Sequence, residues 1–238
     1  MGTSTDRTGG SGGAWTPLKH AATSLMQAAD SGRRSPTALR RVLARHVAVL
    51  GGVTGAVAGA RAGRVGAQRL GAVLAGIGGA GLGEALDAQG LSDLVGADRL
   101  TVLDALASYV AGDGADLDSQ AARDAMFDVL AELFPDADSW AELDAVGLDA
   151  DHVRDLLELF LARYIYNRIP VIAERLARLD DPVKTQQAEQ DLQQMVHSFV
   201  HLGMPSDALQ VDWAGPQGRA IIDETLRTVY EALDMLES

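Results

Sequence analysis

The chain has 238 residues, of which 47% are hydrophobic and only 5% aromatic, and its formal net charge is −13. This length and hydrophobic fraction suit one large domain or two small ones with a core built from Ala, Leu and Val. The absence of cysteine excludes disulfides, thiolate metal sites and cysteine nucleophiles. It fits a cytoplasmic location, and the first residues lack the apolar core of a signal peptide.

The charge is unevenly distributed along the chain. Residues 1–83 contain ten Lys/Arg and two acids, a net charge of +8, whereas residues 84–238 contain ten bases and thirty-one acids, a net charge of −21. Such a split favours binding of the basic part to nucleic acid, to an acidic partner, or to the chain's own acidic half. Composition leaves these alternatives open.

Composition also suggests three regions. Residues 1–14 are rich in glycine and nearly free of apolar side chains, so we expect a disordered N-terminal arm. Residues 15–83 form a basic, Gly/Arg-rich helical segment, and residues 84–238 an acidic helical domain. Trp15 would anchor the arm, and Pro17 is expected to open a helix over residues 18–29.

The next helix has clear local signals. Ser35 is a plausible N-cap, Pro36 suits the first helical position, and Gly51 and Gly52 end the pattern. Arginines in and after this helix form a candidate basic interaction surface: Arg33, Arg34, Arg40, Arg41, Arg45, Arg61, Arg64 and Arg69.

Glycines recur every four residues from Gly51 to Gly63, which on a helix makes a stripe for close packing. Arginines interrupt the following apolar run, so no membrane span is expected. Residues 51–63 are predicted to be a loop or a marginal helix. The GxGxxG pattern at Gly76, Gly78 and Gly81 lacks a preceding strand, which favours a packed turn over a nucleotide-binding loop.

The acidic part predicts successive amphipathic helices. One has Leu100, Leu106 and Val110 on its apolar face. The next would be capped by Asp118 or Ser119 and stopped by Pro135. A long apolar pattern from residue 150 is expected to kink or divide at Pro170, and two further helices follow, the last with Pro216 near its start. No alternating β-branched run is present, so the predicted fold is all-α, a multi-helix bundle-like domain.

No sequence motif selects a catalytic or metal site. His197 and His201 are spaced for one metal ion, but no third ligand adjoins them. Acids such as Asp149 and Asp181 lie at helix boundaries, where they act as caps. No P-loop and no GxSxG elbow is present. We therefore expect no enzymatic activity, no metal and no cofactor.

The segments "MGTST", "LRRVLARHV", "GARAGRVGAQRLGAVLAGI" and "LASYVAGDGADLDSQAARDAMFDVLAEL" resemble the QatB family, whose members are associated proteins of the Qat anti-phage defence system. The resemblance covers roughly residues 1–180, and beyond them the likeness is only in helical character. It implies three partners in a bacterial defence complex: an ATPase-like subunit (QatA), a QueC-like enzyme (QatC) and a TatD-like nuclease (QatD).

The resemblance also suggests a role for the N-terminus. QueC-like enzymes use ATP to activate the carboxylate of a 7-deazaguanine for attack by an amine. Cellular aminopeptidases usually remove Met1 before a small residue, which would expose the unhindered amine of Gly2. Asp6 stands where a myristoylation motif needs Ser or Thr. We therefore expect Gly2 to be the modification acceptor, with Thr3 and Ser4 recognised by the QueC-like partner.

Two other functions compete with this one. In the first, the chain is an adaptor whose basic segment carries nucleic acid to the nuclease, so that binding weakens steeply with salt and is lost when Arg40 and Arg41 become alanine. In the second, the chain is a structural scaffold that neither binds nucleic acid nor is modified.

Overall fold

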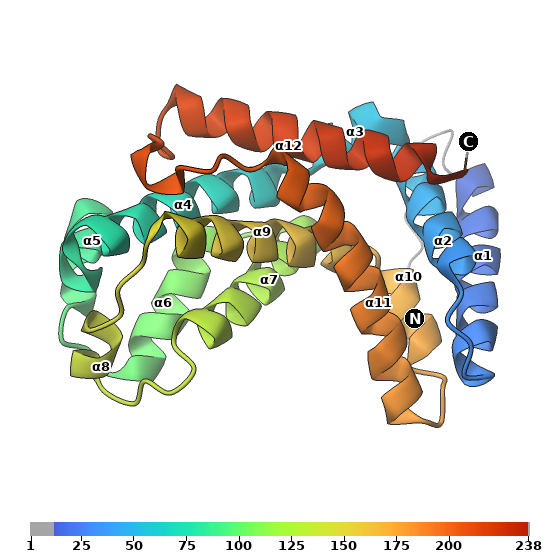
Figure 1. The fold of residues 1–238 in the computed structure, drawn as a ribbon, viewed down its shortest axis with the longest axis horizontal. Helices are drawn as coiled ribbons and strands as arrows, with labels where there is room; N and C mark the ends of the chain where they lie inside the picture. Colours follow the sequence, from blue (N-terminus) through green and yellow to red (C-terminus); the bar gives the residue numbers. More distant parts are fainter. Residues whose placement is uncertain (1–11, 238) are drawn as a thin grey trace. The chain divides into compact units, whose positions relative to one another are not determined.

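Helices form all the regular structure in residues 12–237, the part of the chain that the computed structural model describes, and that part contains no strand (Figure 1). The all-α prediction is confirmed. The α-helices are α1 (Gly12–Asp30), α2 (Pro36–Val49), α3 (Gly52–Gly59), α4 (Arg61–Ala80), α5 (Leu82–Ala88), α6 (Arg99–Ala111), α7 (Leu117–Leu133), α8 (Trp140–Asp144), α9 (Ala150–Asn167), α10 (Pro170–Leu176), α11 (Pro182–Val200) and α12 (Pro216–Asp234). Short 3₁₀ turns are η1 (Ser92–Leu94), η2 (His201–Gly203), η3 (Ala208–Gln210) and η4 (Met235–Glu237).

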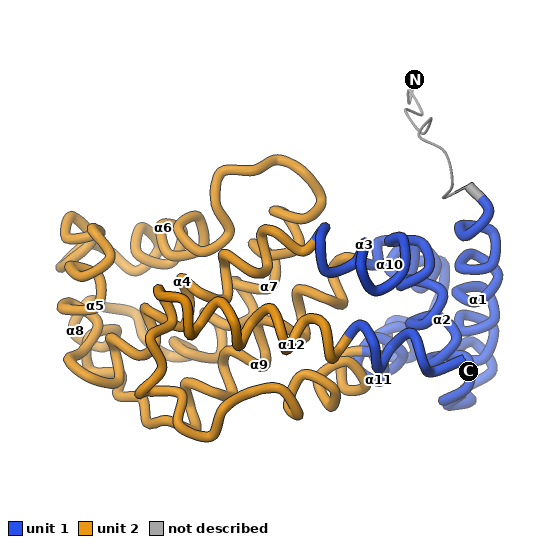
Figure 2. The backbone as a smooth tube through the Cα atoms, turned by 90° about the horizontal axis from the view of Figure 1, so that it is seen from above, with its two compact units in different colours: residues 1–59, 169–192, 230–238 blue, residues 60–168, 193–229 orange. Residues whose placement is uncertain are grey.

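The chain forms two compact units that are not continuous in sequence (Figure 2). Unit 1 comprises Met1–Gly59, Ile169–Leu192 and Tyr230–Ser238, and unit 2 comprises Ala60–Arg168 and Gln193–Val229. Helices α11 and α12 each contribute residues to both units. The predicted boundary at residue 83 separates a basic segment from an acidic one. As a boundary between domains it stays a prediction.

In unit 1, α2 begins and ends where its sequence signals predict. The Ser35 side chain accepts a hydrogen bond from the Ala38 amide, and Pro36 opens the helix. The apolar face is buried, including Leu39, Val42, Leu43 and Val47. At the C-terminal end Gly51 and Gly52 have φ of +90° and +74°, which glycine adopts without the strain other residues would incur.

Two prolines have different effects in unit 1. Pro17 was expected to open a helix, but α1 begins at Gly12 and Pro17 lies inside it. The carbonyl that loses its partner belongs to exposed Gly13, where water can replace the missing N–H. Pro170 does divide the long apolar pattern, because α9 ends at Asn167 and α10 starts at Pro170.

In unit 2, α4 is the central element and packs against α5, α6, α7 and α9. Its glycines face large side chains: a Cβ added at Gly63 would lie 2.1 Å from the Tyr164 ring, and one at Gly71 would lie 2.5 Å from the Trp213 ring. At these two glycines the α4 backbone contacts aromatic rings directly. The stripe predicted from Gly51 to Gly63 does not lie on one helix, because Gly51 is in a turn, Gly55 and Gly59 lie in α3 and Gly63 lies in α4. Gly76 and Gly78 lie in α4, and only Gly81, with φ of +91°, lies in a turn at its end, so the segment expected to be a packed turn is mostly helix.

Two details of unit 2 differ from the sequence prediction. Leu100 is 71% exposed, because α6 turns Val102, Leu106 and Val110 inward instead. The cap of α7 is Asp116, which accepts hydrogen bonds from the amides of Asp118 and Ser119, because the helix begins at Leu117, two or three residues earlier than expected.

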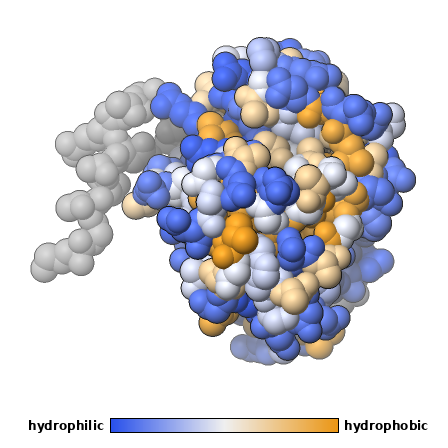
Figure 3. Space-filling view, turned by 90° about the vertical axis from the view of Figure 1, so that its left-hand side faces the viewer, coloured by the Kyte–Doolittle hydropathy of each residue, from blue (hydrophilic) through white to orange (hydrophobic). Residues whose placement is uncertain are grey.

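The surface of unit 2 mixes polar and apolar residues. Figure 3 views the face that carries α5 and α8, where hydrophobic areas are interrupted by hydrophilic ones. Of the helices in residues 12–237, none alone has the length and apolar composition to cross a bilayer. Helices α2 and α3, bent by 76° at the break between them, meet that test only as a pair.

Candidate functional site

The predicted modification site, Gly2 with Thr3 and Ser4, lies outside the described residues. The first described element, α1, starts at Gly12. The predicted disordered arm also falls largely on residues before this point. These residues therefore remain a prediction from sequence.

The eight arginines of the predicted basic surface are divided between the two units. The five between residues 33 and 45 belong to unit 1, and the three between residues 61 and 69 belong to unit 2.

Most arginines of unit 1 contact acids of the same unit. Arg34 lies 3.4 Å from the Asp191 carboxylate, and Arg45 lies 2.6 Å from the Glu237 carboxylate, which Arg41 also approaches at 3.5 Å. Arg33 donates to the hydroxyl of Ser31 at 3.0 Å. The side chain of exposed Arg40 makes no hydrogen bond or ion pair with the residues that the structure describes.

In unit 2, two of the three arginines serve internal contacts. Arg64 pairs with Asp223. Arg69 donates to the backbone carbonyl of Tyr109 at 2.6 Å, and its guanidinium lies 5.2 Å from the centre of the Tyr109 ring. Exposed Arg61 pairs with no acid within residues 12–237. Most arginines of the predicted surface thus make contacts within their own unit.

Net charge by unit explains this pairing. Unit 1 contains ten Lys/Arg and ten Asp/Glu and is neutral, whereas unit 2 contains ten and twenty-three and carries the whole −13. The basic helices of the first 59 residues are neutralised by acids from residues 169–192 and 230–238. This matches the alternative in which the basic part binds the chain's own acids.

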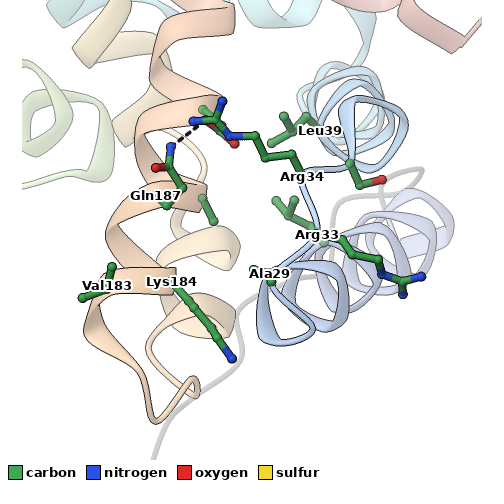
Figure 4. Close-up of a pocket in the computed structure, with 12 residues that line it drawn as sticks. Ala29, Arg33, Arg34, Leu39, Val183, Lys184 and Gln187 are labelled. Carbon is green, nitrogen blue, oxygen red and sulfur yellow. Dashed lines mark hydrogen bonds and ion pairs between the residues drawn. The ribbon is translucent and has the colours of Figure 1, made fainter.

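A cavity of about 230 Å³ opens in unit 1 between the C-terminal end of α1, the start of α2 and the first turns of α11 (Figure 4). Leu25, Leu39 and Ala188 supply apolar walls. Arg34 extends across the cavity toward Gln187, whereas Arg33 points away from α11. The sequence singled out Arg34 but not Gln187 or Asp191.

The polar side of the cavity is a network on α11. The Gln187 amide donates to Asp191 Oδ1 at 2.9 Å, and Arg34 lies 3.4 Å from the same oxygen. Lys184 donates to the backbone carbonyl of Asp30, which satisfies an orphan group at the end of α1. The spacing of Lys184, Gln187 and Asp191 along one helix face is the signal that could have found them.

Asp118 joins three elements of unit 2. Its carboxylate accepts hydrogen bonds from the Tyr164 hydroxyl and, at 2.7 Å, from the Ala62 amide, and Arg168 lies 3.4 Å away. The Ala62 amide belongs to the first turn of α4, where the N-cap residue Ala60 offers no side-chain acceptor. Asp118 therefore caps α4 from a distance, instead of capping α7 as predicted.

Glu158 on α9 is a buried carboxylate, only 1% exposed. It contacts His201 Nδ1 at 2.9 Å, and Arg154 lies 3.6 Å away on the other side. Within residues 12–237 no group of three His, Asp or Glu side chains is arranged to hold a metal ion. The His197/His201 pattern instead places His201 against a buried acid.

Comparison with models of protein families matches residues 51–233 to the family described as "Qat anti-phage system associated protein QatB". The match covers most of the 238 residues. The chain belongs to the QatB family. Comparisons with curated proteins and with solved structures give no match.

Membership of the QatB family makes the chain a component of the Qat anti-phage system. The matched residues extend to 233, so the likeness continues well beyond the limit near residue 180 that the resemblance indicated. They include all of unit 2, with Asp116 and Asp118 in the "DGADLDSQAARDA" stretch. The first 50 residues, with the "MGTST" start, lie outside the match.

Acidic helix caps of this QatB-family chain should make its stability pH-dependent. The backbone amide of Ser119 lowers the pKa of Asp116, the Thr101 hydroxyl lowers that of Asp98, and the His152 amide lowers that of Asp149, all from 3.8. These contributions are present above the unfolded pKa and are lost as pH falls through the lower folded values.

We therefore expect the thermal midpoint of the wild-type chain, followed by circular dichroism, to fall steeply below about pH 4. A triple variant with neutral caps, Asp98→Ser, Asp116→Ser and Asp149→Ser, should lose less over the same range because serine caps do not titrate. Equal losses in both proteins would show that these caps do not set the acid limit.

Proposed function

We propose that this chain is a non-catalytic subunit of the Qat system and that its Gly2 is the substrate of the QueC-like partner. In this proposal Met1 is removed, and the α-amine of Gly2 forms an amide with a 7-deazaguanine base. Thr3 and Ser4 lie next to the acceptor and are recognised by the partner's channel.

The reaction needs only an unhindered amine from this chain. The QueC-like enzyme converts the carboxylate of the base into an acyl-adenylate with ATP, releasing pyrophosphate. The neutral Gly2 amine attacks the acyl carbon, the C–N bond forms, AMP leaves, and the amine loses a proton. An α-amine has a pKa of about 7.7–8.0, so a useful fraction is neutral near pH 7.

The observation that carries the proposal is membership of the QatB family together with the "MGTST" start. Geometry is compatible with it. Nine residues lie between Gly2 and Gly12, the first residue of α1, and the ten residue-to-residue steps span at most about 33–36 Å. That reach suffices for the terminus to enter an active site on a docked partner.

The helical body would then serve to dock the partners. Unit 2 carries the entire net charge of −13. A field of that sign attracts basic surfaces and accelerates their association at low salt. We propose that the QueC-like enzyme and the ATPase-like subunit bind this body and that the nuclease acts in the same complex.

Substitutions at Gly2 test the proposal directly. Gly2→Leu should keep Met1 on the chain, because aminopeptidases reject a bulky second residue, and should therefore abolish conjugation and phage protection. Gly2→Ala is the matched control: it keeps a small second residue and an accessible amine, so a reduced but measurable conjugate is expected. Peptide mass spectrometry and plaque counts give the two readouts.

Both substitutions lie ahead of α1, so the helical content of the variants should equal that of the wild type. Full phage protection by the Gly2→Leu variant, in a strain where the wild type depends on an active QueC-like partner, would contradict the proposal.

A further inference from the structure

The cavity of unit 1 has the size of a single planar ring system. Its volume is about 230 Å³, below the ~300–1,000 Å³ typical of sites for drug-sized ligands. Leu25 and Leu39 are 4% and 5% exposed and form one apolar side, while Ala188 and Val183 lie on α11 opposite. Val183 is 72% exposed, so the cavity is open to solvent on that side.

A carboxylate lies at this cavity with one oxygen to spare. The Asp191 side chain is only 16% exposed. Gln187 and Arg34 both contact Oδ1, and Oδ2 accepts no hydrogen bond from the described residues. A half-shielded carboxylate oxygen beside apolar walls favours a ligand that brings N–H donors to it.

We propose that this cavity binds a guanine-type base, with the Asp191 carboxylate accepting from the two adjacent N–H groups of its Watson–Crick edge. A guanine-type ring presents a ring N–H and an exocyclic NH₂ next to each other, followed by a carbonyl oxygen. Asp191 Oδ2, which is spare, accepts from the first two, and the second N–H of the Gln187 amide donates to the third. Adenine has a ring acceptor at the corresponding position, which would repel Asp191.

The flat faces of the base find partners in the same cavity. Leu39 and Ala188 contact an aromatic face without a polar penalty. The Arg34 guanidinium, whose side chain is 70% exposed, is planar and can stack over the other face. Figure 4 shows Arg34 crossing the cavity toward α11, where such a cover would lie.

The bound base could have either of two origins. The first is a free guanine-type base or nucleoside, and the second is the base joined to the chain's own Gly2. The second rests on the proposed function. From Gly12 to Leu25 the α1 helix rises about 20 Å, and the ten residues before it span at most about 33–36 Å. A conjugated terminus is therefore long enough to reach the cavity of its own unit.

The test uses the unmodified full-length chain and guanosine as the probe, with saturation-transfer NMR and titration calorimetry. Guanosine should bind, and adenosine should bind at least about tenfold more weakly. Asp191→Asn keeps the size of the side chain but removes the paired acceptors, so guanosine affinity should fall about tenfold or more. Asp180→Asn, at an exposed acid that does not line the cavity, is the matched control and should leave affinity unchanged.

A second variant guards against misfolding. Ala188→Leu fills the cavity floor and leaves Asp191 in place, so it should also block guanosine while the circular dichroism spectrum stays that of the wild type. Absence of guanosine binding at millimolar concentration, equal binding of adenosine, or wild-type affinity in Asp191→Asn would each overturn the proposal.

The modified chain, purified after expression with the active partner, distinguishes the two sources. If the tethered base occupies the cavity, added guanosine no longer binds to the modified chain. If the ligand is a free base, modified and unmodified chains bind guanosine equally. If Gly2 is not conjugated, the intact mass of the purified chain shows it. Guanosine binding to the unmodified chain is measured separately and does not depend on that outcome.

Discussion

Replacing Gly71 with valine is expected to destabilise unit 2 by about 3 kcal/mol or more. An added Cβ would lie 2.5 Å from the Trp213 ring. Trp213 is 1% exposed and its indole N–H donates to the Ala208 carbonyl at 2.8 Å, so the ring has little room to move. Thermal and urea unfolding followed by circular dichroism should show a much lower midpoint.

Gly79→Ala is the control on the same helix. Gly79 is exposed, and a Cβ there meets nothing within 4 Å. The midpoint should therefore rise slightly, because alanine favours helix over glycine by up to about 1 kcal/mol. A Gly71→Val protein as stable as the wild type would show that contact between the α4 backbone and Trp213 does not hold unit 2 together.

Replacing Asp118 with alanine should cost about 3 kcal/mol of the free energy of unfolding. The change removes the acceptor of the Ala62 amide at the start of α4 and the carboxylate that faces Arg168, whose side chain is 8% exposed. Removing the charge partner of Arg168 and removing the cap of α4 both lower the free energy of unfolding. Urea unfolding at neutral pH measures the difference.

Asp124→Ala provides the matched control, because Asp124 is an exposed acid of the same helix and should change stability by less than about 0.5 kcal/mol. A double-mutant cycle with Tyr164→Phe should give a coupling energy of about 0.5–3 kcal/mol, since the Tyr164 hydroxyl donates to Asp118. If the two substitutions had additive effects on the free energy of unfolding, the Asp118 and Tyr164 side chains would not stabilise the fold cooperatively.

The parts of the fold that were predictable depend on local chemistry. Ser35, Pro36 and the glycines after residue 50 mark the ends of α2 through the conformations they allow, and Pro170 divides a helix through its missing N–H. Sequence periodicity alone also identifies the all-α class. Where local signals compete, as among Asp116, Asp118 and Ser119, the cap was assigned to the wrong residue.

The contacts that build the candidate site join residues far apart in the chain. Arg34 meets Asp191, and Arg45 meets Glu237, so the pairing of basic with acidic helices depends on the tertiary fold. Composition suggests that acids of the chain neutralise its basic helices, but it does not identify which acids pair with which arginines. The cavity escaped prediction for the same reason, because its walls come from the consecutive helices α1 and α2 and from α11, which lies more than a hundred residues further along the chain.

Conjugation of Gly2 can be measured through the intact mass of the chain, with sequencing of its N-terminal peptide, after expression with the active QueC-like partner and with an inactive one. We predict loss of Met1 in both cases and, only with the active partner, an added mass equal to a 7-deazaguanine amide on Gly2. An unmodified Gly2, or a retained Met1, in cells where the partner is demonstrably active would contradict this prediction.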